Sequence, residues 1–139
     1  MDISGIDVVK SFIAAINQRD VTQLSELMTE DHTFVDSGGT VVTGRDTMAA
    51  GWGQYYQMFP DFKIEIENIL EGNGLIAVFG STSGTYNGKR GLVPENRIEM
   101  PAAWKAIVEV GKIKHWQVYT DWTEGSKIIE EDQARANKS

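Results

Sequence analysis

The sequence predicts a single α+β domain, in which N-terminal helices pack against a curved, mixed and mainly antiparallel sheet. Three observations support this fold class. The chain has 139 residues, which is near the commonest size of one domain. Its residues are 41% hydrophobic and 24% charged, as in ordinary globular proteins. Apolar residues recur at helical spacing in the first half of the chain, whereas they alternate with polar residues, as in strands, in the second half.

Two helices are expected at the N-terminus. Ser4 opens a capping box, and apolar residues then recur on one stripe as far as Gln18. Asp20, with Gln23 three residues later, is a second start signal. The apolar residues that follow it predict a short amphipathic helix that reaches Met28.

A small hairpin and a third helix should follow. The hairpin has strands over 32–36 and 40–43, joined by Ser37-Gly38-Gly39. The segment that starts at Thr43 is another helix N-terminus, and an aromatic stripe then runs to Pro60, where a helix must stop.

The remaining chain predicts strands. One begins at Phe62, turns at Asn73-Gly74 and continues into a long strand over 75–86. A loop rich in Gly, Lys, Arg and Pro then reaches Asn96 and is a candidate lid or pocket rim. Two more strands are expected over 97–110 and 112–122, with Trp104 and Trp116 on one concave face. Residues 1–123 thus form the domain, and 124–139 are expected to be a loosely held polar tail.

Composition excludes several classes of function. Without cysteine the chain has no disulfide and no thiolate nucleophile. Its formal charge of −7 would repel a nucleic acid backbone. No apolar run is long enough to cross a bilayer and the first residues lack a signal-peptide pattern, so we expect a cytoplasmic protein with no membrane partner.

No metal or cofactor is expected either. The sequence contains no glycine-rich phosphate loop and no metal-binding motif. His32 and His115 are isolated from each other, and for both we favour a place at the surface or at a pocket rim.

The order of elements, together with FPDFKIEIENIL followed by an Asn-Gly turn and a long strand, resembles the SnoaL-like domain. That family belongs to the nuclear transport factor two-like superfamily, which includes ketosteroid isomerase and limonene epoxide hydrolase. The resemblance covers about Val8 to Trp122. It implies a cone with a central apolar pocket, a small apolar or polycyclic ligand, and a homodimer formed through the outer sheet face near Ile107 and Tyr119.

Asp36 is the best catalytic candidate that the resemblance offers. Thr33-Phe34-Val35-Asp36 lies where ketosteroid isomerases carry a TVEDP-like segment with the general base. Phe12 and Trp104 stand where that enzyme has its two oxyanion donors, so ketosteroid isomerisation itself is not expected. Asp121, which corresponds to an aspartate of SnoaL cyclases, is the second choice, although strict strand alternation turns it away from the pocket. A turn-capping carboxylate is the structural alternative for Asp36.

The same comparison argues against epoxide hydrolysis, because Val118 stands where limonene epoxide hydrolases have an acid. The inward positions that could bind a flat apolar ligand, or else form plain core, are Phe12, Trp52, Tyr56, Trp104, Trp116, Val118 and Thr120. Three functions therefore remain open at this point. They are an isomerase, cyclase or lyase that uses Asp36, a non-catalytic carrier of a small ligand, and an interaction domain with a vestigial pocket.

Overall fold

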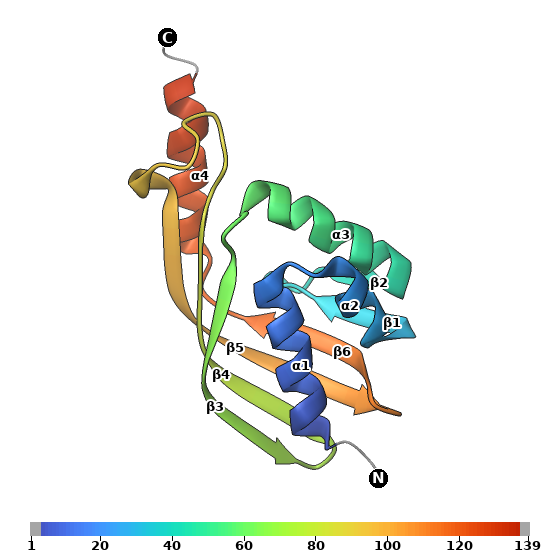
Figure 1. Cartoon of the computed structure of the whole chain (residues 1–139). Helices are drawn as coiled ribbons and strands as arrows, with labels where there is room; N and C mark the ends of the chain where they lie inside the picture. Colours follow the sequence, from blue (N-terminus) through green and yellow to red (C-terminus); the bar gives the residue numbers. More distant parts are fainter. Residues whose placement is uncertain (1–3, 137–139) are drawn as a thin grey trace.

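The computed structural model describes residues 4–136, in which four α-helices accompany one six-stranded sheet (Figure 1). The helices are α1 Gly5–Gln18, α2 Val21–Glu26, α3 Arg45–Met58 and α4 Thr123–Ala136, with a short 3-10 helix, η1, at Pro94–Asn96. The strands are β1 Met28–Val35, β2 Val41–Thr43, β3 Lys63–Gly72, β4 Leu75–Thr85, β5 Arg97–Glu109 and β6 Lys112–Tyr119. The predicted α+β class is confirmed.

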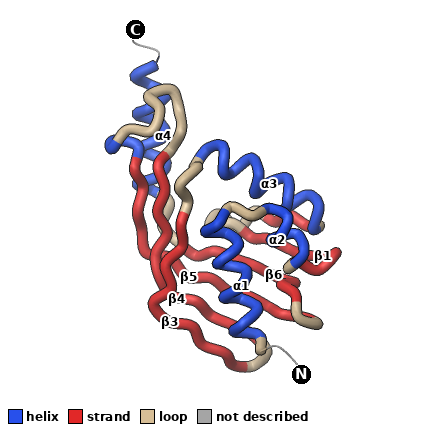
Figure 2. Tube along the Cα trace, viewed as in Figure 1, coloured by secondary structure: helices blue, strands red, loops and turns tan. Residues whose placement is uncertain are grey.

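The sheet has the order β2-β1-β6-β5-β4-β3 and is open at both edges. Strands β3 to β6 form an antiparallel meander, while β1 runs parallel to β6, so the sheet is mixed and mainly antiparallel as predicted. Figures 1 and 2 show the sheet curving, with α1, α2 and α3 on its inner face and α4 standing beside the far ends of β4 and β5.

Local signals placed the first two helices. The Ser4 hydroxyl accepts a hydrogen bond from the Asp7 amide, and the Asp20 carboxylate accepts one from the Gln23 amide. Each side chain thereby pairs an amide that the first helical turn would leave unsatisfied.

The predicted extension of the second helix to Met28 was wrong. Helix α2 ends at Glu26, and β1 begins at Met28 rather than at His32. The reason is tertiary, because β6 captures this segment: the Ile113 amide donates to the Leu27 carbonyl, and Met28 pairs with Ile113.

Two tight turns set the register of the meander, Asn73-Gly74 between β3 and β4 and Val110-Gly111 between β5 and β6. Asn73 and Gly74 both have positive φ, 52° and 76°, as a two-residue hairpin turn requires. In the register that results, Trp104 and Trp116 share the concave face with ring centroids 6.2 Å apart, as predicted.

Two strand details differ from the expected alternation. Strand β3 has a bulge between Ile66 and Asn68, and Ile66 is exposed instead of facing the core. Strand β6 ends at Tyr119, so the residues up to Trp122 belong to no strand.

The expectation of a loosely held segment from Glu124 was also wrong. This segment forms α4, with Ile128 and Asp132 buried. Ile128 completes a second apolar cluster with Phe59, Ile98 and Met100. Apolar burial on one helix face therefore outweighs the polar composition. Residues 137–139 of the predicted tail lie outside the described residues.

The main core lies between the concave face of the sheet and the first three helices. Its largest fully buried side chains include Trp116, Phe12, Ile16, Leu24, Met28 and Ile113. Within residues 4–136, none of the helices is both long and apolar enough to cross a membrane.

Candidate functional site

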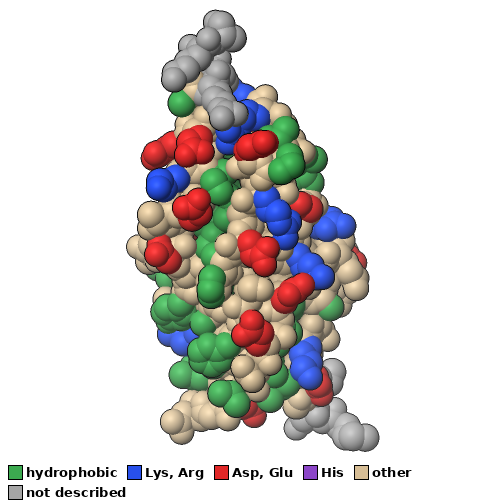
Figure 3. All heavy atoms as spheres, turned by 90° about the vertical axis from the view of Figure 1, so that its left-hand side faces the viewer, with side chains coloured by type: hydrophobic (Ala, Val, Ile, Leu, Met, Phe, Trp, Pro, Cys, Tyr) green, Lys and Arg blue, Asp and Glu red, His purple; other side chains and the backbone are tan. Residues whose placement is uncertain are grey.

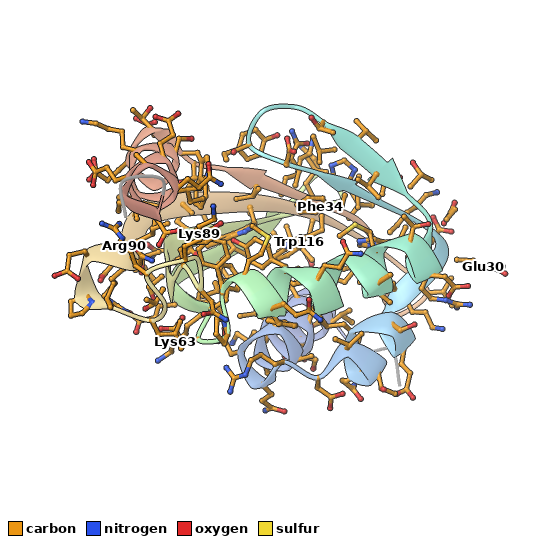
Figure 4. The ribbon with its side chains drawn as sticks, turned by 90° about the horizontal axis from the view of Figure 1, so that it is seen from above. Glu30, Phe34, Lys63, Lys89, Arg90 and Trp116 are labelled. Atoms are coloured by element: carbon orange, nitrogen blue, oxygen red, sulfur yellow. The ribbon has the colours of Figure 1, made fainter. Side chains whose placement is uncertain are left out.

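Phe12, Trp104 and Trp116, three of the predicted ligand-binding residues, pack against one another at the centre of the core. The Phe12 ring meets Trp116 edge-on at 5.1 Å, and Trp104 stacks on Trp116. All three side chains are buried. Figure 4 shows Trp116 in the middle of the molecule next to Phe34, its partner on β1. These aromatic side chains pack as core in this structure.

Trp52 and Tyr56, also predicted for the ligand, lie on α3. Their rings stack with centroids 5.7 Å apart. The Tyr56 hydroxyl donates to the Ile16 carbonyl at 2.8 Å, which ties α3 to α1. Burial raises the pKa of Tyr56, so its phenol stays protonated. The indole nitrogen of Trp52 is buried and has no hydrogen-bond partner among the described residues.

The last predicted residues lie at and beyond the end of β6. Val118 is half-buried beside Trp104 on the neighbouring strand. The Thr120 hydroxyl donates to the Pro101 carbonyl at 2.8 Å. Asp121, the second catalytic candidate, is exposed and accepts hydrogen bonds from the amide and hydroxyl of Thr123. Those bonds lower the pKa of Asp121, and they give it a capping role at the start of α4.

A small cavity lies away from these residues, between α3, the distal halves of β4 and β5, and the segment that leads into α4. The centre of a water molecule can move through about 20 Å³ of it, which is room for one or two waters. Its lining is Tyr55, Phe59, Phe62, Thr82, Ser83, Gly84, Ile98, Met100 and Trp122. None of these residues was among the ligand-binding residues expected from the sequence.

One sequence signal could have located this cavity. The inward-facing residues of β4 change from Ile76 and Val78 to Thr82 and Gly84. Small residues at inward strand positions leave space on the concave face. The cavity lies beside that small-residue half of the strand.

Thr82 and Tyr55 bring polar atoms to the cavity wall. The Thr82 hydroxyl is buried and has no hydrogen-bond partner among residues 4–136. Burial raises the pKa of Tyr55, so its hydroxyl is neutral. The remaining wall is mainly aromatic and aliphatic. Such a site suits an apolar molecule that carries one hydrogen-bonding group.

Asp36 lies at the end of β1, where it is half-buried and organises the turn into β2. Its Oδ1 accepts hydrogen bonds from the Gly38 and Thr40 amides, both at 2.9 Å. Its Oδ2 takes no hydrogen bond from the described part of the chain. One carboxylate oxygen, Oδ1, therefore holds the turn together.

His32 is the titratable group whose environment was predicted wrongly. It is fully buried instead of lying at the surface or a rim, and its Nδ1 lies 2.8 Å from the Ile113 carbonyl. A carbonyl can only accept, so Nδ1 carries the proton and Nε2 is left with a lone pair. Nε2 is buried with no partner among the described residues. His32 lies in the stretch between Met28 and Thr33 where the pairing of β1 with β6 is irregular. His115, by contrast, is half-buried on the outer side of β6.

Metal ligands do not gather in residues 4–136: no three His, Asp or Glu side chains there lie close enough to hold an ion.

Solved structures share this fold over most of the chain. A candidate SnoaL-like polyketide cyclase from Shewanella denitrificans OS-217 matches with a TM-score of 0.78 and 16% identity, covering 91% of this chain and 96% of that one. An LEH-like epoxide hydrolase from M. tuberculosis gives 0.74 and 16%, with 96% of each chain covered. TerC, co-crystallised with polyporic acid, gives 0.75 and 17%, with 90% and 97% covered.

At these identities the likeness concerns the fold alone. Comparison with curated protein sequences gave no significant match. The family model of the SnoaL-like domain matches residues 9–116, which is more than half of the chain. On this evidence the chain belongs to the SnoaL-like domain family.

Proposed function

We propose that this protein binds a small, largely apolar molecule that carries one hydrogen-bonding group, in the cavity between α3 and the sheet. The observation that carries the proposal is the Thr82 hydroxyl, which is buried and unpartnered among the described residues in an otherwise mainly apolar wall. An unpaired buried hydroxyl costs about 1–3 kcal/mol. A ligand oxygen would remove that cost.

The kind of molecule follows from the wall. Tyr55, Phe59, Phe62 and Trp122 present aromatic rings, which favour flat apolar ligands. Fold relatives support this reading, since one was crystallised with polyporic acid and another is a candidate polyketide cyclase. We therefore propose an aromatic or polycyclic molecule.

Thr82→Val tests the binding proposal, because it keeps the shape of the side chain and removes the hydroxyl. Wild-type protein should bind 2-naphthol more tightly than naphthalene, and the variant should lose about three- to tenfold of that preference, the worth of one hydrogen bond. Thr82→Val should also raise the free energy of unfolding by about 1 kcal/mol, because an unpaired buried group is removed. Titration calorimetry and urea unfolding measure the two effects. Thr33→Val on β1 is the matched control, and equal preference in all three proteins would reject Thr82 as the anchor.

Acid–base chemistry through Asp36 is the finer part of the proposal. Asp36 does not line the cavity, so this chemistry requires a ligand that extends from the cavity to the end of β1. In this role Oδ2 takes a proton from a carbon next to a ligand carbonyl. In an isomerisation or a cyclisation the proton returns to another atom of the ligand, whereas in a dehydration it goes to the hydroxyl group that leaves as water. The two amides on Oδ1 hold the carboxylate in one orientation. The non-catalytic alternative is a carrier, in which Asp36 only organises its turn.

Asp36→Asn separates these two readings. In heavy water, wild-type protein should exchange the acidic C–H protons of 2-tetralone, and the variant should do so about 10²- to 10⁴-fold more slowly. The substitution preserves size and can still accept the two turn amides, so binding of 2-tetralone should persist. Proton NMR follows the exchange, and Asp46→Asn, at an exposed aspartate of α3, is the control. Equal exchange in wild type and Asp36→Asn would leave the carrier reading.

We further propose that two copies associate through the outer face of the sheet. Phe79 pairs with Ala103, and Ala103 pairs with Tyr119, so these side chains form a row across three strands on the face opposite Trp104. Phe79 and Tyr119 are exposed, as is Leu70 on β3. Figure 3 looks onto the side that carries β3 to β5 and shows hydrophobic side chains between charged ones. Such a homodimer is compatible with all three functions, a carrier, an enzyme, and an interaction domain with a vestigial pocket.

A further inference from the structure

The first turn of α4 is joined to the sheet by a short connection that includes a cavity wall. Residues 120–122 link β6 to α4 and pair with no strand. Trp122 lines the cavity and meets Phe59 edge-on at 6.3 Å. A Cβ at Gly125 would lie 2.9 Å from the Trp122 ring, so helix and indole are in close contact. Trp122 thus lies in the connection itself and packs against the first turn of α4, so a movement of that turn would act on a residue of the cavity wall.

The far end of α4 is held by a buried charge. Asp132 is fully buried, and its carboxylate accepts the amides of Lys89 and Arg90 at 2.8 Å and the side-chain nitrogen of Asn96 at 3.0 Å. The Arg90 guanidinium lies 3.4 Å away. Figure 4 shows Lys89 and Arg90 on the loop beside α4. Gly88 touches the carboxylate so closely that a Cβ there would collide with it.

This contact is ionic at neutral pH. Burial alone would raise the pKa of Asp132, but the hydrogen bonds from Asn96, Arg90 and Lys89 and the charge of Arg90 outweigh burial and lower it. The net stabilisation from a buried ion pair is small, because the cost of taking both charges out of water offsets much of their attraction. The contact between Asp132 and the loop can therefore fix the position of α4 and still be broken at a moderate cost.

The other cavity walls cannot separate so easily. Strands β4 and β5 are paired along their length from Ile76 to Thr85. Helix α3 is anchored by Trp52 and Met48 in the main core. By contrast α4 contributes Ile128 to the small second cluster and pairs with no strand. Helix α4 itself lines no part of the cavity, but its Ile128 packs on the lining residues Phe59, Ile98 and Met100. Of the elements around the cavity, α4 is therefore the one that can move away with the least loss of contacts.

We propose that α4 is a hinged lid over the cavity, that Asp132 is its latch on the loop of residues 86–96, and that an apolar ligand enters when this latch opens. The inference rests on the proposed function, because a lid matters only if the cavity binds a ligand. It also answers a question of size. Room for one or two waters cannot hold an aromatic molecule, so the cavity has to expand before binding.

Hydrogen exchange on Asp132→Asn tests the latch without any ligand. Asparagine keeps the size but removes the charge, and its amide group can accept at one atom only. We expect the amides of Lys89 and Arg90, which donate to Asp132, to exchange at least about tenfold faster, while the β4 and β5 amides keep their rates. Glu131→Gln, which removes the same charge from the exposed face of α4, is the control. Unchanged protection of both loop amides would overturn the latch.

The gate is tested by the rate at which N-phenyl-1-naphthylamine, an uncharged fluorescent aromatic probe, enters the full-length chain. Stopped-flow association should be at least about tenfold faster in Asp132→Asn than in wild type or Glu131→Gln. Uptake at equal rates, with the loop amides exposed, would overturn the gate alone. No uptake by any of the proteins would overturn the proposed function, and the gate with it.

Gly88→Ala provides a second route to the open state if Asp132→Asn fails to fold. The added methyl group would displace Asp132 and the ring of Tyr86 from the loop side, and it leaves every charge in place. Faster probe entry in this variant, with cooperative unfolding retained, supports the lid. Entry at the wild-type rate with exposed Lys89 and Arg90 amides contradicts it.

Discussion

A neutral histidine in the core makes stability depend on pH in a direction that can be worked out. Burial lowers the pKa of His32 from the ordinary 6.5, and the hydrogen bond to the Ile113 carbonyl only partly opposes that effect. Above pH 6.5 the residue is neutral in both folded and unfolded chains. Below it the unfolded chain takes up a proton that the folded chain does not, so stability falls with falling pH until the folded value is reached.

Urea unfolding at about pH 7.5 and about pH 5.5 measures this effect. The free energy of unfolding should fall in that interval, with a slope of at most about 1.4 kcal/mol per pH unit for one proton. His32→Asn should remove the slope, because its amide can replace Nδ1 toward Ile113 and does not titrate. His115→Gln should retain it. A slope that survives in His32→Asn would assign the pH dependence to another group.

His32 also shows why the surroundings of a side chain were harder to predict than the strand face on which it lies. Alternation correctly puts His32 on the same strand face as Phe34, which packs on the core. The partner that makes burial tolerable is the carbonyl of Ile113, which is 81 residues away. A periodic pattern contains no information about such a partner. The same holds for Asp36. Its role in holding the turn could be predicted from the neighbouring residues, whereas its distance to a ligand depends on tertiary structure.

At the scale of elements, glycine acts in opposite ways in β4 and in α3. A Cβ at Gly80 would collide with the backbone carbonyl of Glu65, beside the β3 bulge. A Cβ at Gly51, in the middle of α3, would meet nothing within 4 Å. Gly80 thus allows two backbones to approach, while Gly51 only weakens its helix.

The two alanine substitutions should therefore change stability with opposite sign. Gly80→Ala should lower the free energy of unfolding by about 2–3 kcal/mol, because a backbone cannot move aside as a side chain can. Gly51→Ala should raise it by up to about 1 kcal/mol. Guanidinium unfolding measures both, and Gly53→Ala, also with open space around it, should repeat the gain. A loss in Gly51→Ala would mean that α3 moves in a way that needs this glycine.

Elements with local start and stop signals were predictable, and those defined by distant contacts were not. Ser4 and Asp20 cap their helices through neighbours three residues away, and Asn73-Gly74 closes its turn alone. By contrast α4 has a polar sequence, and what orders it is the burial of Ile128 on Phe59 and Ile98 and of Asp132 under the loop around Arg90. Those partners lie far earlier in the chain, so composition alone suggested a loose segment.

For the whole molecule, the curved sheet has one face covered by helices and one face open. Across the open face the pairs Phe79–Ala103 and Ala103–Tyr119 align apolar side chains, with Lys105 on the next row. Exposure is 45% for Phe79 and 48% for Tyr119, which is high for aromatic side chains in the middle of a sheet. A second copy of the same face is a self-complementary cover for such a row.

Sedimentation velocity at micromolar concentration should therefore give twice the chain mass of 15.4 kDa. Phe79→Asp places a carboxylate in the interface of each copy, and burying an unpaired charge costs several kcal/mol, so dimer affinity should fall by at least about 100-fold. Val110→Asp adds the same charge at an apolar residue that is 94% exposed in the β5–β6 turn, away from the row, and should leave the dimer intact. A monomeric wild type, or two variants that dissociate equally, would reject the outer sheet face as the interface.

Because the cavity opens on the opposite side of the sheet, Phe79→Asp should leave the rate of N-phenyl-1-naphthylamine entry unchanged. A slower entry would mean that the two faces are coupled through β4.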